Sequence, residues 1–154
     1  MKYFVGIVMM FLLGLTAIRC DQASICLSNQ HAVQVSLYSA RSATDKDTSL
    51  TSASVIGVEM PDSVYKNTTI QELFLPLSFT SDTTAFVIHT NTLRDTVWFS
   101  HTKELYYISR ECGFSFNFKM DSVWTTQTFI DSVAINYDEI NYNESAENVK
   151  IYIF

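Results

Sequence analysis

The chain is poor in the residues that interrupt regular structure, with only four glycines and two prolines among 154 residues. This scarcity excludes a collagen-like or linker-rich chain, and four glycines cannot build a glycine-rich phosphate loop. Charged residues make up only 17% of the chain and hydrophobic residues 47%, which excludes an intrinsically disordered protein. The apolar material suffices for the core of one folded domain.

Basic residues are also scarce, and lysine and arginine form no cluster anywhere in the sequence. The formal net charge is -6, and removal of residues 1–19 would delete Lys2 and Arg19 and leave -8. Binding to phosphate groups needs a basic patch, so we expect neither a nucleic acid partner nor attraction to an anionic membrane surface.

The longest apolar run lies at the start of the chain, from Tyr3 to Ile18, directly after Lys2. It is too short to span a bilayer comfortably, which takes about 20 residues. A charged start followed by a short apolar run is typical of a signal peptide. We therefore predict a signal peptide helix over residues 1–19, with a permanent transmembrane anchor as the alternative.

Cys20 follows this run and is itself followed by Asp21. The arrangement resembles a bacterial lipoprotein signal, in which the cysteine becomes the lipidated first residue. Arg19 departs from the pattern, which has a small residue before the cysteine, and simple secretion is the alternative. The resemblance implies lipid attachment at Cys20, a short tether over residues 20–24, and a location at either face of the bacterial outer membrane.

The chain has three cysteines, Cys20, Cys26 and Cys112, and an odd thiol in an exported protein needs an explanation. If Cys20 carries lipid, Cys26 and Cys112 remain as a pair in an oxidising compartment. Closing so long a loop would stabilise the fold by up to about 4–5 kcal/mol in the chain-entropy model. The alternative is two separate buried thiols, and the wide spacing does not suit zinc.

Apolar and polar residues alternate along much of the remaining chain, as they do in half-buried strands. The alternating segments are 33–37, 73–79, 86–88, 97–99, 114–118, 133–137 and 149–153. Turn-rich segments such as 61–69 and 138–148 separate them. We therefore predict a single all-β domain over residues 25–154. It is an antiparallel β-sandwich of seven to eight strands, immunoglobulin-like or transthyretin-like, with a closed barrel as the alternative.

Two segments qualify this strand pattern. Pro76 lies inside an alternating segment and cannot donate a backbone hydrogen bond, so we expect that strand to lie at a sheet edge or to be bulged. The best helical candidate is the segment 101–109, HTKELYYIS, which is interpreted as a short turn or a strand end.

Five segments together resemble an uncharacterised family of small exported lipoproteins from the Bacteroidota, which contains a domain of unknown function. They are ICLSNQHAVQVSLYS, LFLPLSFTSDTTAFVI, DTVWFSHTKELYYIS, ECGFSFNF and NYNESAENVKIYIF. The resemblance runs from Ile25 to Phe154 and implies an exported protein in which Cys26 pairs with Cys112. It implies no activity, cofactor or catalytic residue.

A second resemblance is local. Proteins exported by these bacteria can carry O-glycans on tripeptides of aspartate, serine or threonine, and an apolar residue or threonine. The candidate acceptors in this chain are Ser63, Thr83, Thr96, Ser122 and Ser132. Composition is the alternative explanation, because aspartate favours turns before strands. We expect only one or two of the five to be used.

Residues suited to catalysis or metal binding are few and scattered. The three histidines, His31, His89 and His101, lie in no metal-binding or haem-binding pattern. His89 and His101 fall in strand patterns and could be cross-strand neighbours, although surface or half-buried positions are the default. We expect no metal and no cofactor.

Two further groups could bind a ligand. The segment from Asp138 to Glu147 offers carboxylate and amide oxygens for Ca²⁺, but it lacks the EF-hand spacing, so a solvated hairpin loop is preferred. A carbohydrate-stacking surface could be formed by aromatic residues, with core or cross-strand packing as the default. The candidates are Trp98 and Trp124, together with Tyr106, Tyr107, Tyr142 and Tyr152.

The function predicted from these features is that of a non-enzymatic, lipid-anchored protein of the cell envelope, with a structural or binding role. Its partners would be the membrane, through the lipid, and an envelope protein or glycan. The alternative is a surface accessory module that binds carbohydrate or protein through exposed aromatic residues, and a small hydrolase is a third class.

Overall fold

The computed structural model describes Cys26, residues 31–142 and residues 144–154. The predicted signal peptide, the tether and Cys20 lie outside these residues. Within the described part of the chain, no helix has the length and apolar character needed to cross a membrane. Its regular structure consists of β-strands.

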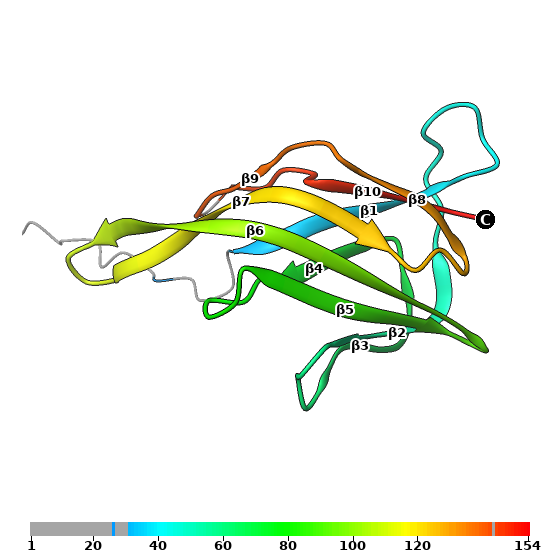
Figure 1. The fold of residues 1–154 in the computed structure, drawn as a ribbon, viewed down its shortest axis with the longest axis horizontal. Helices are drawn as coiled ribbons and strands as arrows, with labels where there is room; N and C mark the ends of the chain where they lie inside the picture. Colours follow the sequence, from blue (N-terminus) through cyan, green and yellow to red (C-terminus); the bar gives the residue numbers. More distant parts are fainter. Residues whose placement is uncertain (1–25, 27–30, 143) are drawn as a thin grey trace, which may run out of the picture.

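The strands form two sheets, which is the β-sandwich predicted from the sequence (Figure 1). The four-stranded sheet has the order β4-β1-β10-β8, and the six-stranded sheet has the order β3-β2-β5-β6-β7-β9. The strands are β1 (Ala32–Ser39), β2 (Leu50–Gly57), β3 (Ser63–Ile70), β4 (Glu72–Pro76), β5 (Thr83–Thr90), β6 (Leu93–Ser109), β7 (Gly113–Thr125), β8 (Ile130–Ile135), β9 (Glu139–Ile140) and β10 (Val149–Ile153).

The first and last strands lie side by side. β1 pairs with β10 in parallel, from Val35 opposite Val149 to Ser39 opposite Ile153. All the other pairs among the ten described strands are antiparallel. The predicted antiparallel sandwich therefore contains one parallel pair. β4 lies at the edge of its sheet and ends at Pro76, which confirms the position predicted from the proline.

The structure has more strands than the seven to eight predicted. The predicted turn segment 61–69 contains most of β3, and β2 was not predicted at all. Both strands contain several serine and threonine residues, which are also common in turns, and this concealed them. Threonine is β-branched and is nevertheless favoured in strands. The helical candidate 101–109 is the second half of β6, and the two-residue β9 lies in the segment predicted as a loop.

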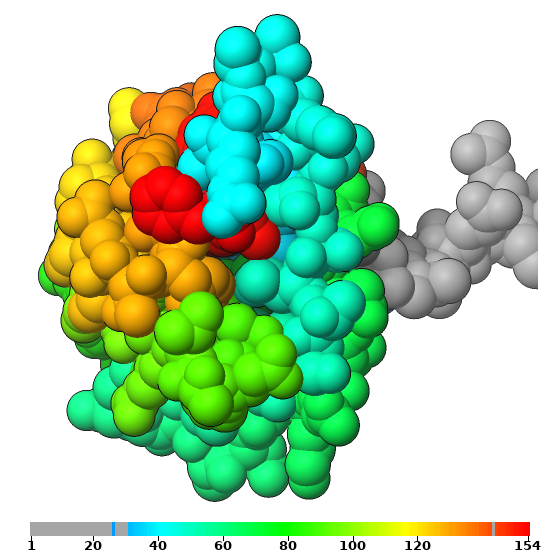
Figure 2. Space-filling model, turned by 90° about the vertical axis from the view of Figure 1, so that its right-hand side faces the viewer, coloured from blue at the N-terminus to red at the C-terminus, as the bar shows by residue number. Residues whose placement is uncertain are grey.

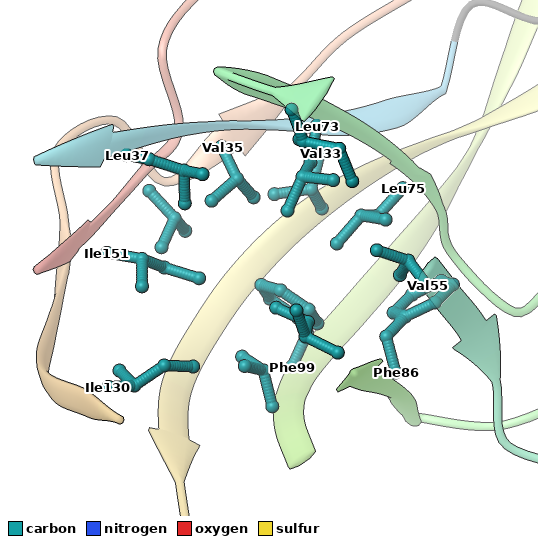
Figure 3. Close-up of a cluster of buried hydrophobic side chains, with 14 of the residues drawn as sticks. Val33, Val35, Leu37, Val55, Leu73, Leu75, Phe86, Phe99, Ile130 and Ile151 are labelled. Atoms are coloured by element: carbon teal, nitrogen blue, oxygen red, sulfur yellow. The ribbon is translucent and has the colours of Figure 1, made fainter. Parts of the chain in front are cut away.

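The core lies between the two sheets and follows the predicted alternation (Figure 3). Val33, Val35 and Leu37 on β1 are fully buried. They lie in the same core cluster as Phe86 on β5 and Phe99 on β6, from the opposite sheet. Adjacent residues on each strand point away from the core, because successive side chains of a strand face opposite sides.

A buried carboxylate joins the two sheets. Asp95 on β6 is fully buried, and its Oδ1 accepts hydrogen bonds from the Thr126 hydroxyl (2.5 Å) and the Thr128 N–H (2.7 Å). Its Oδ2 accepts hydrogen bonds from the N–H groups of Phe129 (2.7 Å) and Ile130 (2.9 Å). These bonds fix the loop that carries the chain from β7 in one sheet to β8 in the other.

The end of the sandwich that carries the C-terminus is covered by the loop after β1. Figure 2 looks onto this end, where the cyan loop stands beside the red C-terminal residues. Asp45 in the loop accepts hydrogen bonds from the Lys150 ammonium (2.7 Å) and the Tyr152 hydroxyl (2.8 Å) of β10. Ala40 also donates its N–H to the carbonyl of Ile153 at 2.8 Å. The loop is therefore fastened to the last strand.

The hydrogen bonds to Asp95 stabilise its ionised form. Burial raises its pKa, but the Thr126 hydroxyl and the three backbone N–H groups outweigh this effect and hold the pKa below the usual value. The folded state therefore favours the carboxylate. The ionised Asp95 therefore stabilises the fold fully at pH values above about 4, the pKa of aspartate in the unfolded chain. This stabilisation is lost as the pH falls through the lower pKa that Asp95 has in the folded protein.

We predict that Asp95→Ala lowers the free energy of unfolding by about 3–5 kcal/mol at pH 7, because it leaves buried donors unpaired. Asp95→Asn should also lower the free energy of unfolding at pH 7. Below about pH 4 the variant should lose less stability than wild type, because it has no carboxylate to protonate at this position. Denaturant unfolding at several pH values measures both effects, with Asp62→Asn, at an exposed position, as the control. An Asp95→Asn variant as stable as wild type would contradict the role of this carboxylate.

Candidate functional site

The outer face of the six-stranded sheet carries a pair of stacked tryptophans. Trp98 on β6 lies directly opposite Trp124 on β7, and their rings are 6.0 Å apart with an angle of 7° between their planes. Val97 and Phe99, on either side of Trp98, point into the core, so Trp98 points outward. Trp124 is 43% exposed. The pair therefore presents an aromatic surface to solvent.

Hydroxyl side chains surround the tryptophan pair. Thr83, Ser100 and Ser122 lie opposite one another on β5, β6 and β7, in the row next to the tryptophans. Thr96 follows on the other side, on the same face as Trp98. We call these four residues and the two tryptophans the Trp face. An exposed aromatic ring with neutral hydroxyl groups beside it is suited to stacking and hydrogen bonding with a sugar ring.

The candidate O-glycan acceptors divide between this face and other parts of the molecule. Thr83, Thr96 and Ser122 belong to the Trp face, and Thr83 and Ser122 are exposed. Ser63 begins β3, and Ser132 lies on β8, where it donates a hydrogen bond to Asp131 at 2.9 Å. The aspartate before Thr96 is the buried Asp95, which bonds to the β7–β8 loop. This structural role accounts for the aspartate of that tripeptide without glycosylation of Thr96.

A disulfide ties the N-terminal side of the domain to the turn between β6 and β7. Cys26 and Cys112, the pair predicted from the sequence, are bonded, with Cα atoms 5.5 Å apart. Cys112 lies in the turn between Ser109 and Gly113, and its N–H donates to the Ser109 hydroxyl at 3.1 Å. Gly113 has φ of +72°, a conformation that glycine adopts without strain.

The three histidines do not form a common site. His89 pairs with Arg94 across β5 and β6, whereas His101 pairs with Met120 on β7, so the two are not cross-strand neighbours as the sequence suggested. His101 is fully buried, and its Nε2 lies 2.9 Å from the Thr84 hydroxyl. Among the described residues, its Nδ1 has no hydrogen-bond partner. This pair has no access to a substrate.

His31 makes a contact that the sequence did not predict. Its Nε2 lies 3.4 Å from the hydroxyl of Ser115, 84 residues further along the chain, and its ring packs on Tyr142 with centroids 5.3 Å apart. Among the residues that the structure describes, no carboxylate hydrogen-bonds to His31. A serine and histidine act as nucleophile and base when a third group orients the imidazole, so this contact is incomplete as a catalytic site.

His31 also lines an apolar groove of about 270 Å³ between the outer strands β3 and β4. Phe74 and Phe79 form its exposed wall, and Val64 on β3 completes the lining. The β4 edge is covered, because Phe74 donates its N–H to the Tyr65 hydroxyl at 2.9 Å and Pro76 has no N–H to offer. Sequence reasoning missed this groove because it treated the β3 segment as a turn.

The acidic side chains of the predicted loop do not gather at one point. Asp138 pairs with Lys119 at 3.5 Å, whereas Glu139 and Glu144 both accept hydrogen bonds from the amide of Asn141. Asn143 lies outside the described residues. In the part of the chain that the structure describes, no group of three or more histidine, cysteine or acidic side chains converges as a metal site requires.

Glu147 faces a polar cleft on the outer side of the four-stranded sheet. It accepts a hydrogen bond of 2.6 Å from the Tyr38 hydroxyl, which, together with burial, raises the pKa of Tyr38 to about 12. Lys150 lies 3.8 Å from Glu147 and is held more closely by Asp45, at 2.7 Å. These polar groups satisfy one another, and a tyrosine with so high a pKa is a poor proton donor at neutral pH.

The features above define an all-β sandwich domain with a disulfide-bonded hairpin. Residues 52–153 match the model of the family of unknown function DUF6452, and the chain belongs to this family. No curated protein and no solved structure matches the chain.

The buried His101 provides a pH-dependent test of the site geometry. Burial, with a smaller contribution from Lys103, lowers the pKa of His101, whereas Asp82 and Asp121 oppose this shift. The folded state therefore favours the neutral imidazole. Below the ordinary pKa of about 6.5, the unfolded chain takes up a proton that the folded chain resists, so stability falls as the pH drops.

We predict that His101→Gln lowers the free energy of unfolding by about 1–3 kcal/mol at pH 7. The difference between the unfolding free energies of wild type and variant should become smaller from pH 7 to pH 5. Denaturant unfolding over this range measures the difference. His89→Gln, at an exposed position on β5, is the matched control for the loss of an imidazole. A difference between His101→Gln and wild type that stays constant from pH 7 to pH 5 would show that the buried imidazole does not control the pH dependence.

Proposed function

We propose that the mature protein is a lipid-anchored, non-enzymatic component of the bacterial cell envelope with a structural or binding role. In this proposal Cys20 carries the lipid and residues 1–19 are a signal peptide. The domain then lies outside the cytoplasm, at the outer membrane, as expected from the resemblance to exported lipoproteins of the Bacteroidota.

The Cys26–Cys112 disulfide is the observation that carries this proposal. Structural disulfides persist in oxidising compartments and are rare in the cytosol, so the pair supports export. It also uses two of the three cysteines, which leaves Cys20 as the odd thiol directly after the apolar run. Lipid attachment gives that remaining thiol a role, and it agrees with the charged start and the short apolar segment.

The geometry of the polar side chains supports a non-enzymatic role. The Thr84–His101 pair is closed off from solvent, and the Ser115–His31 pair is 3.4 Å apart with no orienting acid among the described residues. A catalytic base needs hydrogen-bond contact with its nucleophile and a third group to orient it. A binding role requires only a surface, and the domain offers several exposed aromatic side chains.

The second candidate function is a surface accessory module that binds carbohydrate at the Trp face. The observation that favours it is the nearly parallel stacking of Trp98 and Trp124 beside a row of hydroxyl groups. A neutral sugar would stack on the exposed ring of Trp124 and hydrogen-bond to Ser122 and Ser100. O-glycosylation of Ser122 or Thr83 would compete with such a ligand, since both residues border the tryptophans.

The lipid anchor is tested by metabolic labelling. We predict that wild-type protein incorporates a fatty-acid analogue and fractionates with the membrane, whereas Cys20→Ala loses nearly all of the label. Cys112→Ala serves as the control, because it removes another cysteine of the same chain and should keep the label per amount of protein. Equal labelling of wild type and Cys20→Ala would refute lipid attachment at this residue.

Carbohydrate binding is tested by affinity electrophoresis in gels that contain polysaccharide isolated from the envelope. The wild-type domain should be retarded, and Trp124→Ala should bind at least about tenfold more weakly, because central aromatic contacts dominate binding energy. Phe74→Ala, which removes an exposed aromatic ring outside the Trp face, should bind like wild type. Equal retardation of Trp124→Ala and wild type would exclude the Trp face as the contact surface.

A further inference from the structure

We propose that the far end of the β6–β7 hairpin docks on the lipid–water interface of the bilayer that holds the lipid on Cys20. We call this end the arm and define it as residues 104–117. The inference rests on the proposed function, since it takes the lipid anchor as given, and it adds the surface through which the folded domain contacts the membrane.

The arm extends beyond the rest of the sandwich (Figure 1). β5 pairs with β6 only as far as Ser100, and β9 pairs with β7 at Phe118 and Lys119. From Glu104 opposite Asn117 to Ser109 opposite Gly113, the two strands pair only with each other among the described residues. A two-stranded ribbon is marginally stable without further contacts, and the Cys26–Cys112 disulfide fastens it at the turn.

One face of the arm is apolar and open to solvent. Leu105 lies opposite Phe116 and Tyr107 lies opposite Phe114, so these four side chains share a face. Phe116 is partly buried against the core, whereas Leu105 is 60% exposed, Tyr107 53% and Phe114 64%. Tyr106, on the other face, is also exposed. Large apolar side chains gathered at one tip indicate a contact surface.

The chain between the arm and Cys20 is short. The disulfide places Cys26 beside the turn of the arm, and Cys20 lies six residues before Cys26. Six residues span at most about 20 Å when fully extended. A lipid on Cys20 therefore enters the bilayer close to the arm, and it brings the apolar face of the arm to the membrane surface.

The chemistry of the arm suits the interface of a bilayer. Tyrosine is favoured where an apolar region meets water, because its ring can be buried while its hydroxyl stays hydrated. Leucine and phenylalanine suit the apolar side of the same interface. The charged residues of the arm, Glu104, Arg110 and Glu111, are of both signs, so no strong repulsion opposes approach. A second apolar contact also strengthens anchoring by a lipid chain, which is weak by itself.

The proposal is tested with protein purified from the native envelope and reconstituted in phosphatidylcholine vesicles, which carry no net charge. A carbene-forming photoreagent confined to the bilayer labels residues that enter the membrane, and peptide mass mapping locates the adducts. We expect at least fivefold more adduct on residues 104–117 than on β5. The double variant Leu105→Ser with Phe114→Ser should lose most of this label, and Phe74→Ser, outside the arm, should keep it.

The N-terminal peptide of the same sample shows by its mass whether Cys20 carries lipid, and this separates the two proposals. If Cys20 is unmodified, the lipid anchor is wrong, and a maleimide lipid coupled to Cys20 then restores the tether for the labelling of the arm. Adducts no more frequent on the arm than on β5 in tethered protein would overturn docking of the arm. Docking of the arm would also be overturned if the double variant unfolds like wild type and still retains the label on the arm.

Discussion

The long pairing of β6 with β7 is the constraint on which the rest of the structure depends. A strand presents alternate residues to the same side along its whole length. β6 therefore turns Asp95, Val97, Phe99 and His101 to the core, and the same alternation continues where the strand extends past the core. In the first half of β6 this side holds the buried carboxylate of Asp95, which joins the two sheets. In the second half of β6 the side chains of Leu105 and Tyr107 on the same side are exposed to solvent.

This constraint explains how far the fold can be predicted from the sequence. Period-two alternation identifies Val33, Val35 and Leu37, or Val149, Ile151 and Ile153, as buried faces, and the structure confirms all six. The same rule groups Phe114 with Phe118, yet Phe118 is buried and Phe114 is exposed. Alternation shows which residues share a face, but it does not show where a strand leaves the core, because that depends on the lengths of the neighbouring strands. β2 and β3 were missed for a different reason, since their serine and threonine residues resemble those of turns.

The candidate site was less accessible to sequence reasoning, because it depends on register. Trp98 and Trp124 were recognised as candidates, but their stacking follows from the alignment of β6 with β7, in which Asp121 is the extra residue between Ser122 and Met120. The contact between His31 and Ser115 likewise joins residues 84 positions apart. The disulfide could be predicted because the number of thiols and the expected oxidising compartment constrain it without knowledge of register.

If the lipid anchor and the docking of the arm hold as proposed, they imply an orientation for the domain. With the lipid and the arm at the membrane, the opposite end of the sandwich, where the 40–48 loop covers the C-terminal strand, lies farthest from the bilayer. The tryptophan pair lies on β6 and β7 outside the arm and would then stay in the aqueous phase. In the proposed orientation the two exposed aromatic surfaces would serve different ligands, because the apolar face of the arm would meet lipid while the hydroxyl-bordered tryptophans would face polar partners. The disulfide would link these two proposed roles, since it ties Cys26, six residues after Cys20, to the hairpin that carries both surfaces.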